Sequence, residues 1–215
     1  MKKILVTLGP SSLNEKTVKD ISELGVNLFR INLSHTPLES VEKNINLIQS
    51  WTDTPVCLDS EGAQLRNGLM QDEKTFYKKN DPVKIYFRPV VGDNKSLSFN
   101  PISATQQFAI GDKIQVDFNH VKFEITEKKE NHLLAIVRNS GSIGSNKAAD
   151  INKELLFDPL TEKDRKAIII GLNNGVSNFA MSFTNSANDV KLMRELCGPN
   201  SNIICKIESP SGVKN

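Results

Sequence analysis

The sequence predicts an α/β protein that contains part of a TIM (β/α)8 barrel, about five of its eight strands, with an inserted small all-β barrel. Strand-like and helix-like segments alternate over residues 1–66 and again over 148–215, at the spacing of βαβ units. Residues 67–147 instead contain short β-type runs separated by turn residues. The predicted domains are therefore a partial barrel, residues 1–66 and 148–215, and an inserted β-barrel domain, residues 67–147.

The elements of the first segment follow from short apolar runs and helix-start signals. Apolar runs that end at Gly or Pro are typical of parallel strands buried on both faces. Capping boxes and a proline in the first helical turn mark helix starts. The expected order is a strand at 4–8, a helix opened by the box Ser12–Glu15 and ended by Gly25, a strand at 26–33, a helix from the box Thr36–Glu39 to about Trp51, and a strand at 55–58.

The βα rhythm returns after the β-type segment. The β-type runs lie at 83–87, 113–117, 121–125 and 133–137, and they are followed by a helix from Thr161, a strand at 177–182, a helix at 186–197 and a strand at 203–207. A sheet of five parallel strands would leave apolar edges on its first and last strands, which natural proteins avoid. We therefore expect more polypeptide after Asn215, or another chain, to cover them.

Composition excludes several classes of function. The formal charge of +2 and the absence of a long run of like charge argue against nucleic acid or a membrane surface as a partner. Pro10 interrupts the first apolar stretch too early for a signal peptide, and no run approaches a membrane span. Cys57, Cys197 and Cys205 lie in apolar runs, which favours reduced core thiols and a cytoplasmic location.

Polar residues gather where three predicted strands end, the face on which barrel enzymes build active sites. These segments are Arg30–His35, Asp59–Arg66 and Lys206–Glu208. Alternation places Arg30, Asn32 and Ser34 on one side of an extended chain. Arginine forks bind phosphate and hard oxygen ligands bind Mg-class or alkali cations, so the joint pattern indicates a phosphorylated anionic substrate. Each residue alone could be an ordinary solvated strand end, and His35 alone suits a structural imidazole.

These motifs resemble those of pyruvate kinase, in the same order along nearly the whole chain. The matching runs are Lys3–Ser12, Arg30–His35, Asp59–Arg66, Gly111–Asp117, Pro159–Asp164, Ala180–Phe183 and Lys206–Glu208. In that family the barrel binds phosphoenolpyruvate, and the inserted domain closes over it as a lid with the nucleotide. The resemblance implies phosphoenolpyruvate/pyruvate and ADP/ATP as partners, a role in glycolysis, and a homo-oligomer for a full-length protein.

The resemblance also implies roles for individual residues. Arg30 and Lys206 would contact the transferring phosphoryl group, with Lys206 stabilising charge on it and on the developing enolate. Arg66 would support the substrate pocket. The implied cation sites are Asn32, Ser34, Asp59 and the Ser60 carbonyl for K⁺, and Glu208 for Mg²⁺ or Mn²⁺.

The sequence departs from the family at the third strand, where Asp59-Ser-Glu-Gly-Ala-Gln64 replaces the usual Asp-Thr-Lys-Gly-Pro-Glu. Gln64 replaces the glutamate that accompanies potassium dependence. At ~6 Å and an effective dielectric of ~20, the Glu61 charge would repel a bound phosphate by roughly 3 kcal/mol. Three functions therefore remain open: a pyruvate kinase, a similar barrel acting on another phosphorylated or keto-acid compound, and a non-catalytic homologue that binds an anion or a partner protein.

The family's second metal carboxylate and the threonine associated with enolate protonation belong to later barrel strands. We therefore expect the 215-residue chain alone to lack phosphotransfer activity.

Overall fold

Five parallel strands form the sheet of the first of two compact units. The computed structural model describes residues 3–62, 64–118 and 120–215, and its units are Met1–Ala63 with Asp158–Asn215, and Gln64–Phe157. The strands of the first sheet, in spatial order, are β1 (Leu5–Thr7), β2 (Leu28–Asn32), β3 (Val56–Asp59), β13 (Asn178–Met181) and β14 (Asn202–Cys205). All four neighbouring pairs are parallel. This order is that of consecutive strands in a (β/α)8 barrel, so the predicted partial barrel is confirmed.

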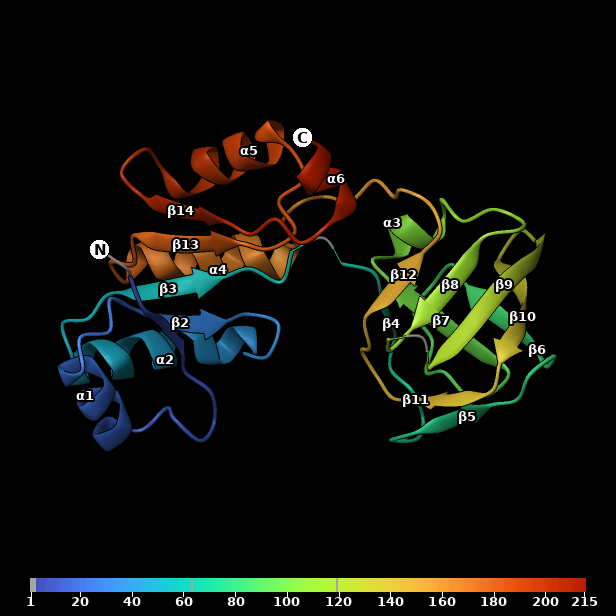
Figure 1. Ribbon diagram of the computed structural model, residues 1–215, viewed down its shortest axis with the longest axis horizontal. Coiled ribbons are helices and arrows are strands. Elements are labelled where there is room, and N and C mark those ends of the chain that lie inside the picture. The colour runs from blue at the N-terminus through green and yellow to red at the C-terminus, as the bar shows by residue number, and fades with distance from the viewer. Residues whose placement is uncertain (1–2, 63, 119) are drawn as a thin grey trace. The chain divides into compact units, whose positions relative to one another are not determined.

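Helices connect these strands and pack against the sheet and against one another. They are α1 (Glu15–Glu23), α2 (Leu38–Trp51), α4 (Glu162–Asn173) and α5 (Ala187–Cys197). Consecutive helices are in contact, and α2 and α4 both pack on β3 (Figure 1). Their apolar faces and the helix-facing side of the sheet share one core, which includes Phe29, Ile31, Leu58 and Phe179. This packing leaves the strand ends free for polar side chains.

Two of the four predicted helix starts differ from the structure. Asn14, not Ser12, caps α1 by accepting from the Thr17 N–H, because the Ser12 hydroxyl instead accepts from the Gly9 N–H in the preceding turn. The N-cap of α2 is Pro37 rather than Thr36, and no side-chain hydrogen bond caps that helix. The starts of α4 and α5 are as predicted, each with a complete capping box.

The two edge strands of this sheet are β1 and β14. Ile204 in β14 and Ile207 just after it are 37% and 52% exposed, which agrees with the expectation of uncovered apolar edges. The expectation that all three cysteines are buried is wrong for Cys205, because it lies on the edge strand β14. A short helix that the sequence pattern did not indicate, α6 (Pro210–Lys214), follows β14.

The second unit is a mostly β structure with its own core. Its main sheet has seven strands, in the order β12 (Ala149–Ile151), β8 (Lys113–Val116), β9 (Val121–Lys128), β10 (His132–Asn139), β6 (Pro82–Tyr86), β7 (Ser96–Asn100) and β4 (Arg66–Asn67). The sheet is nearly closed, because a bridge joins Arg66 in β4 to Ala148 beside β12 (Figure 1). Two further strands, β5 (Thr75–Tyr77) and β11 (Gly141–Ile143), form a separate pair, and one short helix, α3 (Ile102–Thr105), follows β7.

The unit Gln64–Phe157 contains the whole of the predicted inserted segment, 67–147, and extends beyond it at both ends. Its core gathers the inward-facing residues of the sheet, including Tyr77, Phe99 and Phe123. Within the described ranges, no helix has the length and apolar character needed to cross a membrane.

Candidate active site

Asp59 is the centre of a polar cluster at the carboxyl ends of β2, β3 and β14. Its side chain is 1% exposed. Arg30 Nη1 lies 3.1 Å from Asp59 Oδ2, and Lys206 Nζ lies 3.0 Å from each carboxylate oxygen. Burying a carboxylate is costly unless cations and hydrogen bonds surround it. The two cations therefore hold Asp59 in place, and Asp59 in turn fixes the separation of the two cations.

Arg30 owes its direction to the alternation of β2. Phe29 and Ile31 are buried in the core beside the helices, so Arg30 and Asn32 point to the other face of the sheet. Thr7 is the residue paired with Arg30 on β1, and its hydroxyl accepts from Arg30 Nε at 2.7 Å. About a quarter of the Arg30 and Lys206 side chains stays exposed, 27% and 25%, so an anion from solvent can reach both cations.

Lys206 and Glu208 lie in the extended segment that follows β14. The backbone of Lys206 continues the sheet pairing, donating to the Met181 carbonyl at 2.9 Å and accepting from the Thr184 N–H at 3.0 Å. Glu208 Oε1 lies 3.7 Å from Lys206 Nζ, and Glu208 Oε2 accepts from the Phe183 N–H at 3.2 Å. The structure thus brings Arg30, Asp59, Lys206 and Glu208 into one chain of charged contacts.

Oxygen atoms at or just after the ends of β2, β3 and β13 border this cluster. The Ser182 hydroxyl donates to the Ser60 carbonyl at 2.6 Å and lies 3.3 Å from Asp59 Oδ1. The Asn32 side-chain oxygen accepts from the Ser34 N–H at 2.9 Å. Ser34 does not continue the alternation of β2 as expected, because the strand ends at Asn32 and the chain turns there.

Glu61 is paired with a cation that the sequence analysis did not connect to it. Lys163 Nζ, from the first turn of α4, lies 2.9 Å from Glu61 Oε1 and also donates to the Leu33 carbonyl. The side chains of both members of the pair are about 30% exposed, 27% for Lys163 and 31% for Glu61. The positive charge of Lys163 offsets the negative charge of Glu61, so the repulsion of a phosphate calculated for Glu61 alone is too large.

The chain was compared with protein families and with known proteins. The family described as pyruvate kinase, barrel domain, matches residues 1–215. The chain belongs to the pyruvate kinase family. It is similar to the pyruvate kinases of Thermococcus litoralis, Geobacillus stearothermophilus and Clostridium perfringens, at 27%, 28% and 29% identity over 99% of this chain. It spans 47%, 38% and 47% of those proteins, so it covers less than half of each.

The cations implied by pyruvate kinase membership fit this site to different degrees. Asn32, Ser34, Asp59 and the Ser60 carbonyl offer the hard oxygen atoms that suit K⁺. For Mg²⁺ or Mn²⁺ the cluster offers the single carboxylate of Glu208, and the described residues include no group of three or more His, Cys, Asp or Glu that could hold a metal ion. The oxygen donors are of the type that suits K⁺, and their role as its ligands stays a prediction; for a divalent ion the set fits only in part.

Arg66 is the one predicted pyruvate kinase site residue that belongs to the second unit. It lies in β4, where its Nη1 donates to the Asn146 carbonyl at 3.0 Å. Its support of a substrate pocket stays a prediction. Ala63, within the same Asp59–Arg66 motif, lies outside the described residues.

Cys57 lies beneath the cluster on β3, opposite Arg30 on β2. Burial, and after it the neighbouring Asp59 charge, raise the pKa of its thiol to about 12, while the charges of Arg30 and Lys206 oppose the shift. The thiol is thus neutral at physiological pH and acts as part of the packed base of the site.

Sequence reasoning missed four residues that hold the site together: Thr7, Lys163, Asp164 and Ser182. Two of them, Lys163 and Asp164, lie in the pyruvate kinase-like motif Pro159–Asp164, and Ser182 lies in Ala180–Phe183. The signals available in the sequence were these motifs and the position of each residue near a predicted strand end or helix start. The periodicity of the sequence does not predict which distant residue each of them contacts.

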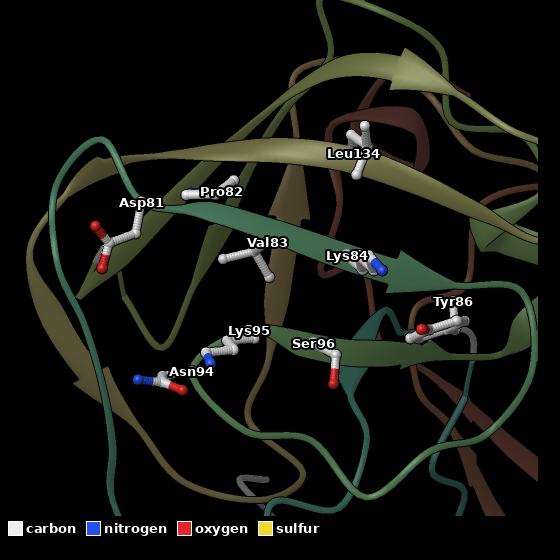
Figure 2. Close-up of a pocket in the computed structure, with 9 residues that line it drawn as sticks. All are labelled: Asp81, Pro82, Val83, Lys84, Tyr86, Asn94, Lys95, Ser96 and Leu134. Carbon is white, nitrogen blue, oxygen red and sulfur yellow. The ribbon is translucent and has the colours of Figure 1, made fainter.

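A separate cavity of about 470 Å³ lies on the second unit and shares no residue with the cluster. Figure 2 shows it along β6, between Leu134 of β10 and Lys95 and Ser96 at the start of β7. Its lining is Asp81, Pro82, Val83, Lys84, Tyr86, Asn94, Lys95, Ser96 and Leu134. It is not part of the strand-end site.

Proposed function

We propose that this chain carries the phosphoryl-binding part of a pyruvate kinase site, which moves a phosphoryl group from phosphoenolpyruvate to ADP. The observation that carries the proposal is the convergence of Arg30 and Lys206 on the buried Asp59 from β2, β14 and β3. Two cations held at fixed separation, each partly open to solvent, form a preorganised receptor for a phosphorylated anion. We place this activity in the cytoplasm, as the free thiols favour.

The residues of the chain act by binding and orientation. Arg30 offers a planar fork to phosphate oxygens, and Thr7 and Asp59 fix the plane of that fork. Lys206 is a point charge that stabilises negative charge as it develops on the phosphoryl group and on the enolate oxygen. Asp59 sets where both cations lie, so the receptor needs little rearrangement when the substrate binds.

Glu208 is the residue we propose as a ligand of Mg²⁺ or Mn²⁺, and Asn32, Ser34, Asp59 and Ser60 are those we propose for K⁺. When bound, these ions would neutralise charge on the phosphoryl oxygens. Glu208 is already oriented toward the cluster by the Phe183 N–H. It would therefore present a fixed oxygen to the ion.

Glu61 is the residue that favoured a different substrate. Because Lys163 offsets its charge at 2.9 Å, electrostatics no longer argues against a phosphate group at this site. A phosphorylated keto-acid precursor such as phosphoenolpyruvate is thus the substrate class that the cluster supports best. Arg66 is the residue that we propose, on the family resemblance alone, as a support of the substrate pocket.

The test is a calorimetric titration of the 215-residue chain with phosphoenolpyruvate at low ionic strength. Arg30→Gln and Lys206→Gln each remove one charge-assisted hydrogen bond, about 1.5–3 kcal/mol, so we expect affinity to fall about 10- to 100-fold. Lys19→Gln is the matched control, because Lys19 is an exposed lysine of the same unit whose salt bridge is with Glu15.

The control variant should bind as the unaltered chain does. Equal affinity in Arg30→Gln, Lys206→Gln and the unaltered chain would refute the proposal, as would an equal loss in all three variants. Unfolding of each variant in urea, followed by Trp51 fluorescence, checks that a loss of binding does not come from loss of the fold.

A further inference from the structure

The carboxylate of Asp164 joins α4 to the loop that follows β3. It is fully buried, with 0% exposure. Its Oδ2 accepts from the Thr161 N–H at 3.0 Å, which completes the capping box of α4. Its Oδ1 accepts from the Glu61 N–H at 2.7 Å, and Oδ2 also accepts from the Gly62 N–H at 3.2 Å. Two of its three backbone donors thus come from a loop more than 100 residues away in the sequence, at separations of 103 and 102.

Asp189 shows what the same capping position does without such a loop. It is the third helical residue of α5, as Asp164 is of α4, and it also completes a capping box. Its carboxylate accepts from the N–H groups of Ser186 and Asn185, at 2.9 and 2.8 Å, which directly precede its own helix. Capping therefore accounts for Asp189 and leaves the two long-range bonds of Asp164 unexplained.

Lys163, the residue before Asp164, reaches the same loop with its side chain. Its ammonium group bonds to the Glu61 carboxylate and to the Leu33 carbonyl, which directly follows β2. The backbone and the side chain of Glu61 are therefore held by two consecutive residues of α4. The loops after β2 and β3 are also joined to each other through one ammonium group.

Ser182 also packs on this loop. The Ser182 N–H donates to the Ser60 hydroxyl at 3.0 Å, and the Ser182 hydroxyl donates to the Ser60 carbonyl at 2.6 Å. A Cβ on Gly62 would lie 2.7 Å from the Ser182 carbonyl oxygen, so there is no free space there. Residues 60–62 are thus held by α4 and by Ser182, directly after Asp59.

We propose that Lys163 and Asp164 are positioning residues that set the path of residues 60–62 and so the place of Asp59 between Arg30 and Lys206. The inference rests on the proposed phosphoryl-binding function of that cluster. Neither residue need touch the substrate. An error of about 1 Å in the placement of a binding group can cost about 100-fold in activity, which is why a buried carboxylate at this point matters.

The test compares Asp164→Asn with Asp189→Asn, which alter the same capping position in two helices of one unit. We expect Asp164→Asn to shift the amide resonances of Glu61 and Gly62, to speed their hydrogen exchange, and to weaken phosphoenolpyruvate binding by about 10- to 100-fold, the usual effect of removing a partner that orients a binding group. Asp189→Asn should leave all three measurements unchanged.

A second experiment leaves Asp164 unaltered. It distinguishes positioning of the loop by Lys163 from neutralisation of the Glu61 charge by Lys163. Lys163→Gln should weaken phosphoenolpyruvate binding, and the double variant Glu61→Gln with Lys163→Gln removes both charges of the pair. If the pair positions the loop, the double variant regains only the loss caused by the uncovered Glu61 charge and stays weaker than the unaltered chain. If the pair only balances charge, the double variant returns to the original affinity, and the role of Lys163 is refuted.

The outcomes separate this inference from the proposed function. If the unaltered chain binds no phosphoenolpyruvate, the proposed function fails, and faster exchange at Glu61 and Gly62 in Asp164→Asn alone would still show the loop-holding role. If the chain binds it and Asp164→Asn binds it equally well, positioning by Asp164 is refuted. If Asp164→Asn does not fold, the Lys163 cycle decides the proposal.

Discussion

Alanine substitutions at Gly62 and Gly175 can measure how tightly the loop after β3 packs against Ser182, as a difference in the free energy of unfolding. Both glycines have left-handed backbone angles, φ of +71° and +76°, and both belong to the first unit. A Cβ on Gly62 would lie 2.7 Å from the Ser182 carbonyl oxygen and 2.8 Å from its Cβ, whereas a Cβ on Gly175 meets no atom within 4 Å. Alanine at Gly175 therefore tests backbone conformation alone, and alanine at Gly62 tests conformation together with a clash.

We expect Gly175→Ala to lower the free energy of unfolding by about 1 kcal/mol, since the left-handed conformation costs an L-residue roughly 1–2 kcal/mol and the stiffer unfolded chain returns part of it. Gly62→Ala should lower it by about 2–4 kcal/mol, because overpacking against backbone adds about 1–3 kcal/mol. Trp51, the single tryptophan of the chain, ends α2 in the same unit and reports unfolding in urea. Equal losses in the two variants, within about 0.5 kcal/mol, would show that the loop is free to move away from Ser182.

Three further predictions concern the core and the cysteines. Phe179→Ala should lower the free energy of unfolding measured with Trp51 by about 3–5 kcal/mol, because Phe179 is fully buried; a loss under about 1 kcal/mol would contradict the packing described. A thiol-reactive chromophore should titrate one cysteine in the folded chain, the exposed Cys205, and all three in denaturant. Above about pH 9 the unfolded chain loses the Cys57 proton and the folded chain keeps it to about pH 12, so stability should fall over this window; Cys57→Ala, which has no thiol to ionise, should show a smaller fall.

Local patterns in the sequence were sufficient to predict the framework of the first unit. The alternation of β2 placed Arg30 opposite its buried neighbours, and the Thr161 and Ser186 capping boxes marked two helix starts. These signals depend on residues within a few positions of each other, where side-chain direction follows from the backbone. The start of α1 was misplaced because Ser12 and Asn14 are both good capping residues, and Ser12 bonds to the turn before it.

The contacts that shape the site lie beyond such patterns. Lys163 bonds to Glu61 across 102 residues and Ser182 bonds to Ser60 across 122. Charge arithmetic on Glu61 alone therefore gave a repulsion that Lys163 offsets. The exposure of Cys205 was missed for a related reason, since an apolar run shows that a strand forms but not that the strand lies at an edge.

The path of the chain into and out of the second unit has a practical consequence. The Ala149 N–H donates to the Leu65 carbonyl at 2.8 Å, and Arg66 and Ala148 form a bridge, so the first residues of the unit run beside the stretch that leads into β12. Bringing the ends of a long segment together normally costs entropy that grows with its length, and here native hydrogen bonds already join them. A gene fragment of this unit should therefore span Gln64–Phe157, because β12 pairs with β8, and Leu155 and Phe157 pack on the core of the unit.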